Sequence, residues 1–234
     1  MTTNKKFYLN AKKHNKNYLR IMRVISKFDI QLVKLSRKVR NHVFYIKDEK
    51  YPYFVSNYNA INTERTVEIP WVENILRQYE SSEILEVGNV LSNYTSFTHD
   101  IVDKYESGPG IINEDIVAFD TGKRYDLIIT ISTLEHIGFD EPQQESGKSV
   151  LAFENLKRLL KTGGKMVITV PLGYNPEIDE FIRVNEKRFQ EVHYLIRTSR
   201  FNYWVEANLG EALKRPYGSK YPAANAVAFI LFQK

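Results

Sequence analysis

The sequence predicts an α/β fold with a mostly parallel sheet, preceded by a basic helical extension. Two observations predict this arrangement: short apolar runs alternate with helical stretches from residue 67 onward, and residues 9–42 lack Pro and Gly. Alternating strands and helices are typical of βαβ units, whose strands are parallel. The 234 residues suit one such domain with an appendage. We therefore place the extension at residues 1–66 and the α/β domain at residues 67–234.

The composition excludes several kinds of chemistry. Hydrophobic residues make up 43% of the chain, which is enough for a folded core. The absence of cysteine excludes disulfides, thiolate catalysis and zinc sites that use cysteine, and we predict no metal site. The first residues, MTTNKKFYLN, have no apolar signal core, and no run reaches the length of a membrane span. These observations favour a cytoplasmic protein.

The charge of the chain is distributed unevenly. Residues 1–50 hold 14 Lys and Arg against 3 Asp and Glu, a net charge of +11, although the whole chain carries +5. A basic segment of this kind can bind an anionic partner, such as nucleic acid, a membrane surface or a phosphorylated substrate. A solvated helix face is the alternative interpretation. The extension therefore indicates an interaction element without identifying its partner.

The extension also carries a regular apolar stripe within residues 18–39. Steps of three and four residues alternate along it, as in a heptad repeat. In one interpretation the stripe packs on its own domain as a lid, and the protein is a monomer. In the other, two stripes meet in a homodimer. Residues 43–66 are rich in Tyr and Asn and are predicted to be irregular. The stripe consists of Tyr18, Ile21, Ile25, Phe28, Leu32, Leu35 and Val39.

Seven short apolar runs predict the strands of the α/β domain. The link between the last two runs, PYGSKYPAAN, is too short for a crossover helix, so we predict that this pair is antiparallel. Pro70 fits the first position of a helix, and Gly163 and Gly164 are typical of the end of another. The runs are Ile84–Val87, Ile101–Asp103, Gly110–Ile112, Leu127–Ile131, Met166–Val170, Phe201–Glu206 and Val227–Phe232.

Polar residues and a glycine stand where the first three predicted strands end. The run ILEVG contains an acid, Glu86, and ends in Gly88, which allows a backbone to approach a ligand closely. Asp103 ends the second strand, 17 residues after Glu86. An acid at this place in an open α/β sheet can accept hydrogen bonds from the hydroxyls of a ribose. Because Asp115 follows the third strand, these residues together indicate a ligand site at one sheet edge.

These segments resemble class I S-adenosylmethionine (SAM)-dependent methyltransferases. ILEVGNV resembles the first motif of that family, YDLIITISTLEHI its fourth strand and the loop that follows, and GGKMVITVP its fifth strand. The sequence departs from the first motif at Val90 and Ser92, where the family has glycine. The resemblance covers about residues 67–234. It implies a Rossmann-like methyltransferase fold, with a seven-stranded, mostly parallel sheet, an antiparallel last strand and SAM as the cofactor.

The resemblance also implies which residues bind the cofactor. The loop at Gly88 would hold the methionine half of SAM. Asp103 would hold the ribose hydroxyls and Asp115 the adenine amino group, with Ile116 packed against the adenine ring. The full set implied for the cofactor is Glu86, Gly88, Asn89, Asp103, Asp115, Ile116 and Ile131.

His136 is the candidate catalytic residue. It lies just beyond the fourth predicted strand, at the carboxyl edge where open α/β sheets bind ligands. A neutral imidazole there can remove a proton from a hydroxyl as the methyl group arrives. The alternatives are a histidine that orders the loop or contacts SAM. Ser132 and Glu135 match a capping box, so we predict a structural role for Glu135 at the start of a helix.

The methyl acceptor is expected beside the loop after the fifth strand. There Tyr174 and Asn175 are candidate substrate contacts, and Arg65 or Arg183 could position an anionic acceptor, such as a phosphate-type oxygen. The segments LEHI, GGKMVITVPLGYNP and YPAANAVAFILFQK resemble bacterial polysaccharide-cluster methyltransferases. This resemblance implies methyl transfer to an oxygen of a small molecule, with a sugar or nucleotide-linked sugar as the first candidate.

Two other functions stay open. An RNA or other nucleic-acid methyltransferase would use the basic N-terminal segment as an electrostatic arm. A catalytically silent protein of the same fold would only bind a partner, which fits the glycines that are missing at Val90 and Ser92.

Overall fold

The computed structural model describes residues 42–56, 60–79, 83–96 and 98–234, together with Gln31, Val33 and Leu35. The chain divides into two compact units, Met1–Asn41 and His42–Lys234. The predicted domain boundary at residue 66 falls inside the second unit. Of the predicted apolar stripe, Leu35 is described and lies in helical backbone. The remaining members lie outside the described residues: Tyr18, Ile21, Ile25, Phe28, Leu32 and Val39.

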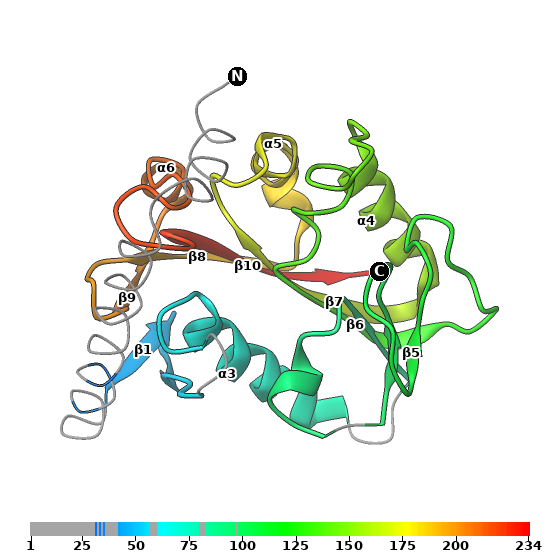
Figure 1. The fold of residues 1–234 in the computed structure, drawn as a ribbon, viewed down its shortest axis with the longest axis horizontal. Coiled ribbons are helices and arrows are strands. Elements are labelled where there is room, and N and C mark those ends of the chain that lie inside the picture. The colour runs from blue at the N-terminus through cyan, green and yellow to red at the C-terminus, as the bar shows by residue number, and fades with distance from the viewer. Residues whose placement is uncertain are drawn as a thin grey trace, which may run out of the picture. The chain divides into compact units, whose positions relative to one another are not determined.

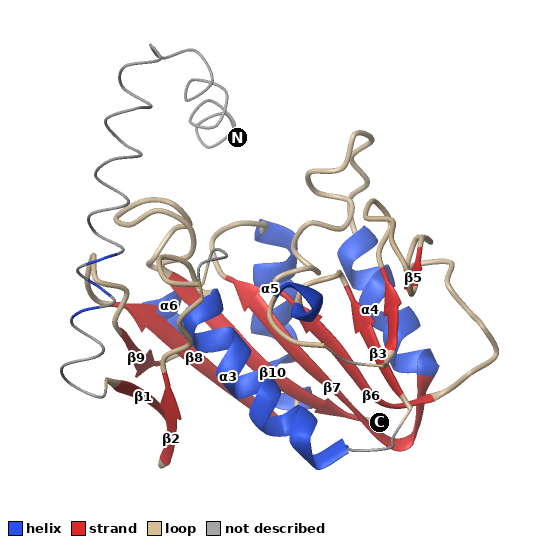
Figure 2. Cartoon of the chain, turned by 60° about the horizontal axis from the view of Figure 1, so that its bottom comes forward, coloured by secondary structure: helices blue, strands red, loops and turns tan. Residues whose placement is uncertain are grey.

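A sheet of eight strands forms the core of the unit His42–Lys234 (Figure 2). The order is β5-β4-β3-β6-β7-β10-β8-β9, and the first five strands are parallel to one another. This arrangement confirms the predicted Rossmann-like α/β class, with one strand more than expected. The strands are β3 (Ile84–Val87), β4 (Asp100–Val102), β5 (Ile111–Ile112), β6 (Tyr125–Ile131), β7 (Leu160–Pro171), β8 (Glu191–Arg197), β9 (Trp204–Ala207) and β10 (Ala226–Gln233).

The strand order reverses between β3 and β6. From β3 the chain moves outward to β4 and β5, and then returns to β6 on the other side of β3. In open α/β sheets, ligands bind at such a switch point, outside the carboxyl ends of the strands. The topology therefore places a binding crevice beside the residues that follow β3, β4, β5 and β6.

The last strand, β10, is antiparallel to both of its neighbours, β7 and β8, as expected for the final strand. Its predicted partner was wrong. The run Phe201–Glu206 forms the edge strand β9, which pairs with β8, and the strand beside β10 is β8 itself. The polar residues of β8 concealed it in the sequence. His193 is only 7% exposed, and its Nδ1 is satisfied by Oε1 of Glu206 on β9, at 3.0 Å.

Helices cover both faces of the sheet. The helices α4 (Lys148–Leu159) and α5 (Pro176–Asn185) lie on one face and α3 (Arg65–Leu76) on the other (Figure 1). A short α6 (Leu209–Ala212) precedes β10. Both faces of β6 are buried, since Ile128 belongs to the core under α4 and Ile129 to the core under α3. This burial explains why β6 reads as a continuous apolar run.

The helix α3 begins five residues before the predicted start. Pro70 was expected at its first position, but it lies inside the helix. Proline has no N–H, so the carbonyl oxygen of Thr66, four residues earlier, loses its partner within the helix. The N–H of Phe54 donates to this oxygen at 2.9 Å. A segment from outside the helix thus satisfies the carbonyl group that Pro70 leaves free.

A hairpin, not an irregular segment, precedes α3. The strands β1 (Val43–Ile46) and β2 (Glu49–Pro52) pair antiparallel. Phe44 is 1% exposed and belongs to the core on the α3 side of the sheet. The hydroxyl of Tyr53 accepts a hydrogen bond from the backbone N–H of Trp204 on β9 at 2.8 Å. The residues just before α3 are therefore part of the α/β unit.

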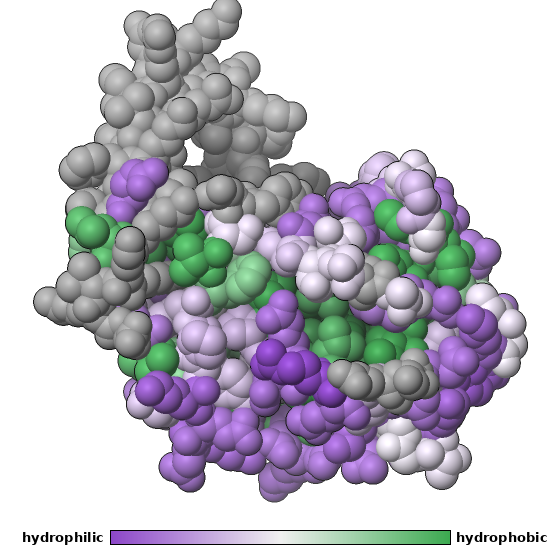
Figure 3. Space-filling model, turned by 90° about the horizontal axis from the view of Figure 1, so that it is seen from below, coloured by the Kyte–Doolittle hydropathy of each residue, from purple (hydrophilic) through white to green (hydrophobic). Residues whose placement is uncertain are grey.

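The α3 side of the molecule has a mixed surface. Hydrophilic side chains follow its lower border, whereas hydrophobic side chains gather nearer the middle (Figure 3). Within the described residues, no helix is long and apolar enough to cross a membrane.

Candidate cofactor and acceptor site

A cavity of about 550 Å³ lies at the carboxyl ends of the parallel strands. Its volume falls within the roughly 300–1,000 Å³ of small-molecule sites. The loops after β3, β4, β5 and β6 line it, as the topology requires. Six residues named from the sequence line this one cavity: Gly88, Asn89, Asp103, Asp115, Ile116 and His136.

The backbone at Gly88 requires a glycine. Its φ is +82°, a conformation that other residues rarely adopt. A Cβ at this position would also collide with Oγ1 of Thr133, which lines the cavity from the loop after β6. The N–H of Gly88 donates to the carbonyl oxygen of Val102 at 2.9 Å. This loop therefore keeps its shape only without a side chain at residue 88.

Glu86 shapes the same loop from below the cavity. Its side chain is fully buried, and Oε1 accepts hydrogen bonds from the N–H groups of Val90 at 2.9 Å and Leu91 at 2.8 Å. Oε2 lies 2.9 Å from Nε2 of His99. These contacts turn the chain into the short 3₁₀ helix Leu91–Asn93. The family motif has further glycines in this loop, at the positions of Val90 and Ser92. Here the carboxylate of Glu86 stabilises the turn by accepting backbone hydrogen bonds.

Asp103 organises the loop after β4. Its carboxylate accepts hydrogen bonds from the backbone N–H groups of Asn89 at 3.1 Å, Tyr105 at 2.8 Å and Glu106 at 2.7 Å. An ionised carboxylate has about four acceptor positions, so Asp103 keeps capacity for a further donor. A ribose hydroxyl is a donor that the Asp103 carboxylate can accept in this part of the cavity.

Asp115 is held by two lysines that the sequence did not single out. Its Oδ2 lies 2.9 Å from Nζ of Lys104 and 3.0 Å from Nζ of Lys148. Partial burial raises the pKa of Asp115, but hydrogen bonds from both lysines outweigh it and hold the pKa at about 2. Glu141 contacts the same lysines, at 2.7 Å and 3.1 Å. Asp115 is therefore an ionised acceptor in a fixed position.

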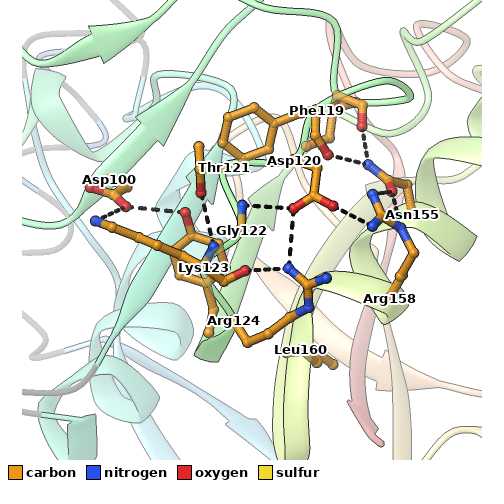
Figure 4. Close-up of polar contacts among 12 residues, drawn as sticks. Asp100, Phe119, Asp120, Thr121, Gly122, Lys123, Arg124, Asn155, Arg158 and Leu160 are labelled. Atoms are coloured by element: carbon orange, nitrogen blue, oxygen red, sulfur yellow. Dashed lines mark hydrogen bonds and ion pairs between the residues drawn. The ribbon is translucent and has the colours of Figure 1, made fainter.

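The loop that carries Asp115 is fastened to α4 (Figure 4). Nδ2 of Asn155 donates to the carbonyl oxygens of Ile116 at 2.6 Å and Phe119 at 3.0 Å. Arg158, also on α4, pairs with Asp120 at 2.5 Å. These contacts keep Ile116, which is 4% exposed, in the cavity wall beside Asp115.

His136 lines the same cavity from the loop after β6. Its Nδ1 lies 2.8 Å from Oδ2 of Asp140, and the hydroxyl of Tyr174 donates to the same oxygen at 2.6 Å. Burial lowers the pKa of His136, but the bond to Asp140 and the charge of Glu135 outweigh it, so the pKa is raised. Asp140 was missed in the sequence, because it lies in a turn, where helical spacing does not indicate a contact.

The predicted capping box at Ser132 is wrong. Turns, not an α-helix, follow β6, and Ser132 has a φ of +42°. Its hydroxyl donates to Oε1 of Glu68 on α3 at 2.5 Å. Glu135 does not reach back to Ser132. Its side chain is buried, and its Oε2 has no hydrogen-bond partner among the described residues.

The other candidate substrate residues do not line the cavity. Asn175 is 1% exposed and caps α5 by accepting from the N–H of Glu177 at 2.9 Å. Arg65 pairs with Glu68 at 2.5 Å, and the exposed Arg183 pairs with Glu180 at 2.5 Å. Ile131 is fully buried in β6, beneath the cavity. Tyr174 approaches the site through Asp140 and through its ring, 4.9 Å from the ring of His136.

The family of the chain follows from its sequence. The methyltransferase domain family matches residues 20–216, which is most of the chain. The chain belongs to this family. With the doubly wound sheet described above, it is a class I SAM-dependent methyltransferase. Comparison with curated proteins finds no match.

Solved structures of methyltransferases are similar to this chain at low identity. The N-methyltransferase NodS from Bradyrhizobium japonicum WM9 is 14% identical, with a TM-score of 0.43, over 69% of this chain and 84% of that one. The glycopeptide N-methyltransferase MtfA is 8% identical, with a TM-score of 0.41, over 70% and 89%. A SAM-dependent methyltransferase from Thermotoga maritima is 10% identical, with a TM-score of 0.42, over 73% and 90%.

The cavity of this methyltransferase fits SAM, the cofactor of the family. Gly88 leaves the backbone of the first loop open to a ligand, Asp103 has a free acceptor position and Asp115 offers an ionised carboxylate. Bound SAM supplies an electrophilic methyl group, because its sulfur is a sulfonium. Of the residues implied for the cofactor, Gly88, Asn89, Asp103, Asp115 and Ile116 line the cavity, whereas Glu86 and Ile131 do not.

Proposed function

We propose that this methyltransferase transfers the methyl group to a hydroxyl oxygen of an uncharged small molecule, with His136 as the general base. One observation carries this proposal: His136 lies in the cavity wall with Nδ1 bonded to Asp140 at 2.8 Å. The bond to a carboxylate favours the tautomer with the proton on Nδ1. Nε2 is then the nitrogen that can accept the proton of a hydroxyl.

The chemistry divides between alignment and proton removal. The cavity walls hold the acceptor oxygen in line with the methyl group, which converts a bimolecular encounter into an oriented one. A hydroxyl is a weak nucleophile until it loses its proton, and a positioned base typically contributes ~10²–10⁴-fold to the rate. Asp140 orients the imidazole and stabilises the imidazolium that forms, as a carboxylate does beside a catalytic histidine.

The pairing of the arginines favours an uncharged acceptor over an anionic one. Arg65 and Arg183 were candidates for binding a phosphate-type oxygen, but Glu68 and Glu180 neutralise them. Asp140 adds a further carboxylate beside His136. A hydroxyl of a free, uncharged sugar meets these conditions, whereas a nucleotide-linked sugar would bring ionised phosphates. The resemblance of the sequence to polysaccharide-cluster methyltransferases supports the same acceptor class, in surface polysaccharide biosynthesis.

The test combines an acceptor screen with His136→Ala. Purified protein is incubated with labelled SAM and a set of sugars, nucleotide sugars and phosphate-containing compounds, and methyl transfer is followed by mass spectrometry. We expect a hydroxyl acceptor, and turnover by His136→Ala that is slower by about 10²–10⁴-fold. Binding of SAM to the variant, measured by calorimetry, should stay unchanged. Equal turnover by the variant and the wild type would refute the role of His136 as a base.

A further inference from the structure

A second carboxyl group faces the candidate base from the interior of the protein. Oε1 of Glu135 lies 3.5 Å from Nε2 of His136, while Asp140 occupies the other ring nitrogen at 2.8 Å. Glu135 is 1% exposed, whereas the His136 side chain is 47% exposed. The imidazole thus lies between two carboxyl groups, one at the surface of the site and one buried beneath it.

The contacts of Glu135 do not account for its burial. Glu86 is equally buried, but both of its oxygens have hydrogen-bond partners. The Oε2 of Glu135 has none among the described residues. A buried polar atom without a partner costs roughly 1–3 kcal/mol, and such atoms in folded proteins call for an explanation. The position of Glu135 against His136 supplies one.

We propose that Glu135 is a positioning residue of the methyl-transfer site, which acts through His136 by fixing the imidazole and stabilising its protonated form. This inference rests on the proposed function of His136. The backbone of Glu135 is itself fixed, because Nδ2 of Asn175 donates to its carbonyl oxygen at 2.9 Å. Asn175 was expected to contact the substrate. Its side chain instead holds the backbone of Glu135.

The proton and charge balance of the reaction shows why a carboxyl group beside His136 would help. The acceptor O–H bond breaks as an N–H bond forms at Nε2 of His136, and an O–CH₃ bond forms as the S–CH₃ bond breaks. The positive charge that leaves the sulfur therefore appears on the imidazole. Two carboxyl groups beside that ring favour the charged form. The exposed side of the ring then returns the proton to water.

The groups that face this pair are consistent with the assignment. Around Glu135 stand His136, Glu68 and Arg65, and Glu68 and Arg65 pair with each other at 2.5 Å. Burial raises the pKa of Glu135 to about 8, partly offset by His136. Around His136 stand Asp140, Glu135 and Arg65. A carboxyl group with this pKa is mostly protonated near pH 7 and ionises most readily beside a protonated imidazole, since His136 is the cation that pairs with it among the described residues.

The test is Glu135→Gln, which keeps the shape of the side chain but cannot ionise. The exposed Glu154 on α4 gives a matched control, Glu154→Gln. The titration of His136 is followed by NMR in the cofactor-free protein, with its signal assigned as the one that His136→Ala lacks. In Glu135→Gln, we expect the imidazole to titrate at lower pH. We also expect the acidic limb of the kcat/KM profile to move the same way and kcat to fall about tenfold.

The dissociation constant of SAM should not change in Glu135→Gln, because Glu135 does not line the cavity. Glu135→Asp, which keeps an ionisable carboxyl group, should preserve most of the wild-type titration and serves as the readout if the Gln variant is unstable. Two results would overturn the inference. One is a His136 titration in Glu135→Gln that matches the wild type. The other is a His136 titration in Glu135→Asp that moves to lower pH as far as it does in Glu135→Gln. The NMR result is independent of turnover, so a failure of His136 as the base stays distinguishable from a failure of Glu135 as its support.

Discussion

The hydroxyl of Tyr174 and Nδ1 of His136 meet at one oxygen atom, Oδ2 of Asp140, at 2.6 Å and 2.8 Å. Asp140→Asn should lower the pKa of His136, because the hydrogen bond from Nδ1 to Asp140 raises it. We expect kcat/KM to fall about 10–100-fold, with the acidic limb of its pH profile shifted to lower pH. Steady-state kinetics between pH 5 and 9 measure both effects. A pH profile that stays at the wild-type position would show that Asp140 does not raise the pKa of the catalytic base.

Asp103→Ala should weaken SAM binding about tenfold or more. The substitution removes an acceptor for the ribose and three hydrogen bonds that hold the backbone of Asn89, Tyr105 and Glu106. Calorimetric titration with SAM measures the change. Asp126→Asn is the matched control, because Asp126 pairs with Lys161 at 2.8 Å and does not line the cavity. Equal affinities for Asp103→Ala and the wild type would remove Asp103 from the cofactor site.

Lys148→Met should raise KM for SAM and leave kcat nearly unchanged. Lys148 is 7% exposed and lies within 3.1 Å of Asp115, Glu141 and Glu145, so its loss leaves Lys104 alone to pair with Asp115 and Glu141. Because Asp115 and Glu145 are partly exposed, the loss of folding stability should be smaller than the roughly 3–5 kcal/mol typical of a fully buried ion pair. Urea denaturation and SAM-dependent kinetics measure the two effects. Lys148→Arg, which keeps the charge, should recover most of the affinity; no recovery would count against an electrostatic role.

The stability of the protein should fall as pH rises through the titration of Asp179. Burial raises its pKa to about 6, partly offset by the hydrogen bond from the N–H of Gly173. The folded state therefore holds a proton that the unfolded state has already lost above about pH 4. Between about pH 4 and 6, the wild type should lose about 2–3 kcal/mol relative to Asp179→Asn, and no more above pH 6. Denaturation curves of both proteins at pH 4, 5, 6 and 7.5 test this; parallel curves would contradict it.

Deletion of residues 1–41, the first compact unit, tests the proposed lid. We expect the mass by light scattering to stay that of a monomer, because three heptads give a marginal coiled coil in water. SAM binding should persist, and methyl transfer should be lost or extend to further acceptors. A wild-type dimer that becomes a monomer with normal transfer would favour the homodimer. Loss of salt-sensitive RNA binding on deletion would favour a nucleic-acid acceptor.

The fold class could be predicted because buried parallel strands leave a simple signal. β6 is apolar at nearly every position, since both of its faces are covered. β8 gave no such signal: the buried guanidinium of Arg197 is satisfied by the carbonyl oxygens of Asn62 and Pro222, 135 and 25 residues away. The start of α3 was also missed because a distant contact is needed. The carbonyl oxygen of Thr66 accepts from the N–H of Phe54, which lies outside the helix.

In the site, too, residues that follow a strand could be predicted from the sequence, whereas contacts between distant residues could not. Gly88, Asp103 and Asp115 could be named because each follows a strand, and parallel strands end at one edge. Lys148 could not, because 33 residues separate it from Asp115 and only the fold brings them within 3.0 Å. The pairing of Arg65 with Glu68, three residues apart on a helix, was available from spacing alone and would have argued against an anionic acceptor.

Asp140 and Glu141 are neighbours in the chain, yet they hold different residues of the cavity wall. Asp140 accepts from His136 and Tyr174, and Glu141 pairs with the lysines that hold Asp115. Glycines with positive φ, Gly138 and Gly147, stand on either side of this loop. A residue inserted between the two acids would move one carboxylate away from its partners. Length variation among relatives that share this pair should therefore fall elsewhere in the loop, between Glu141 and Gly147.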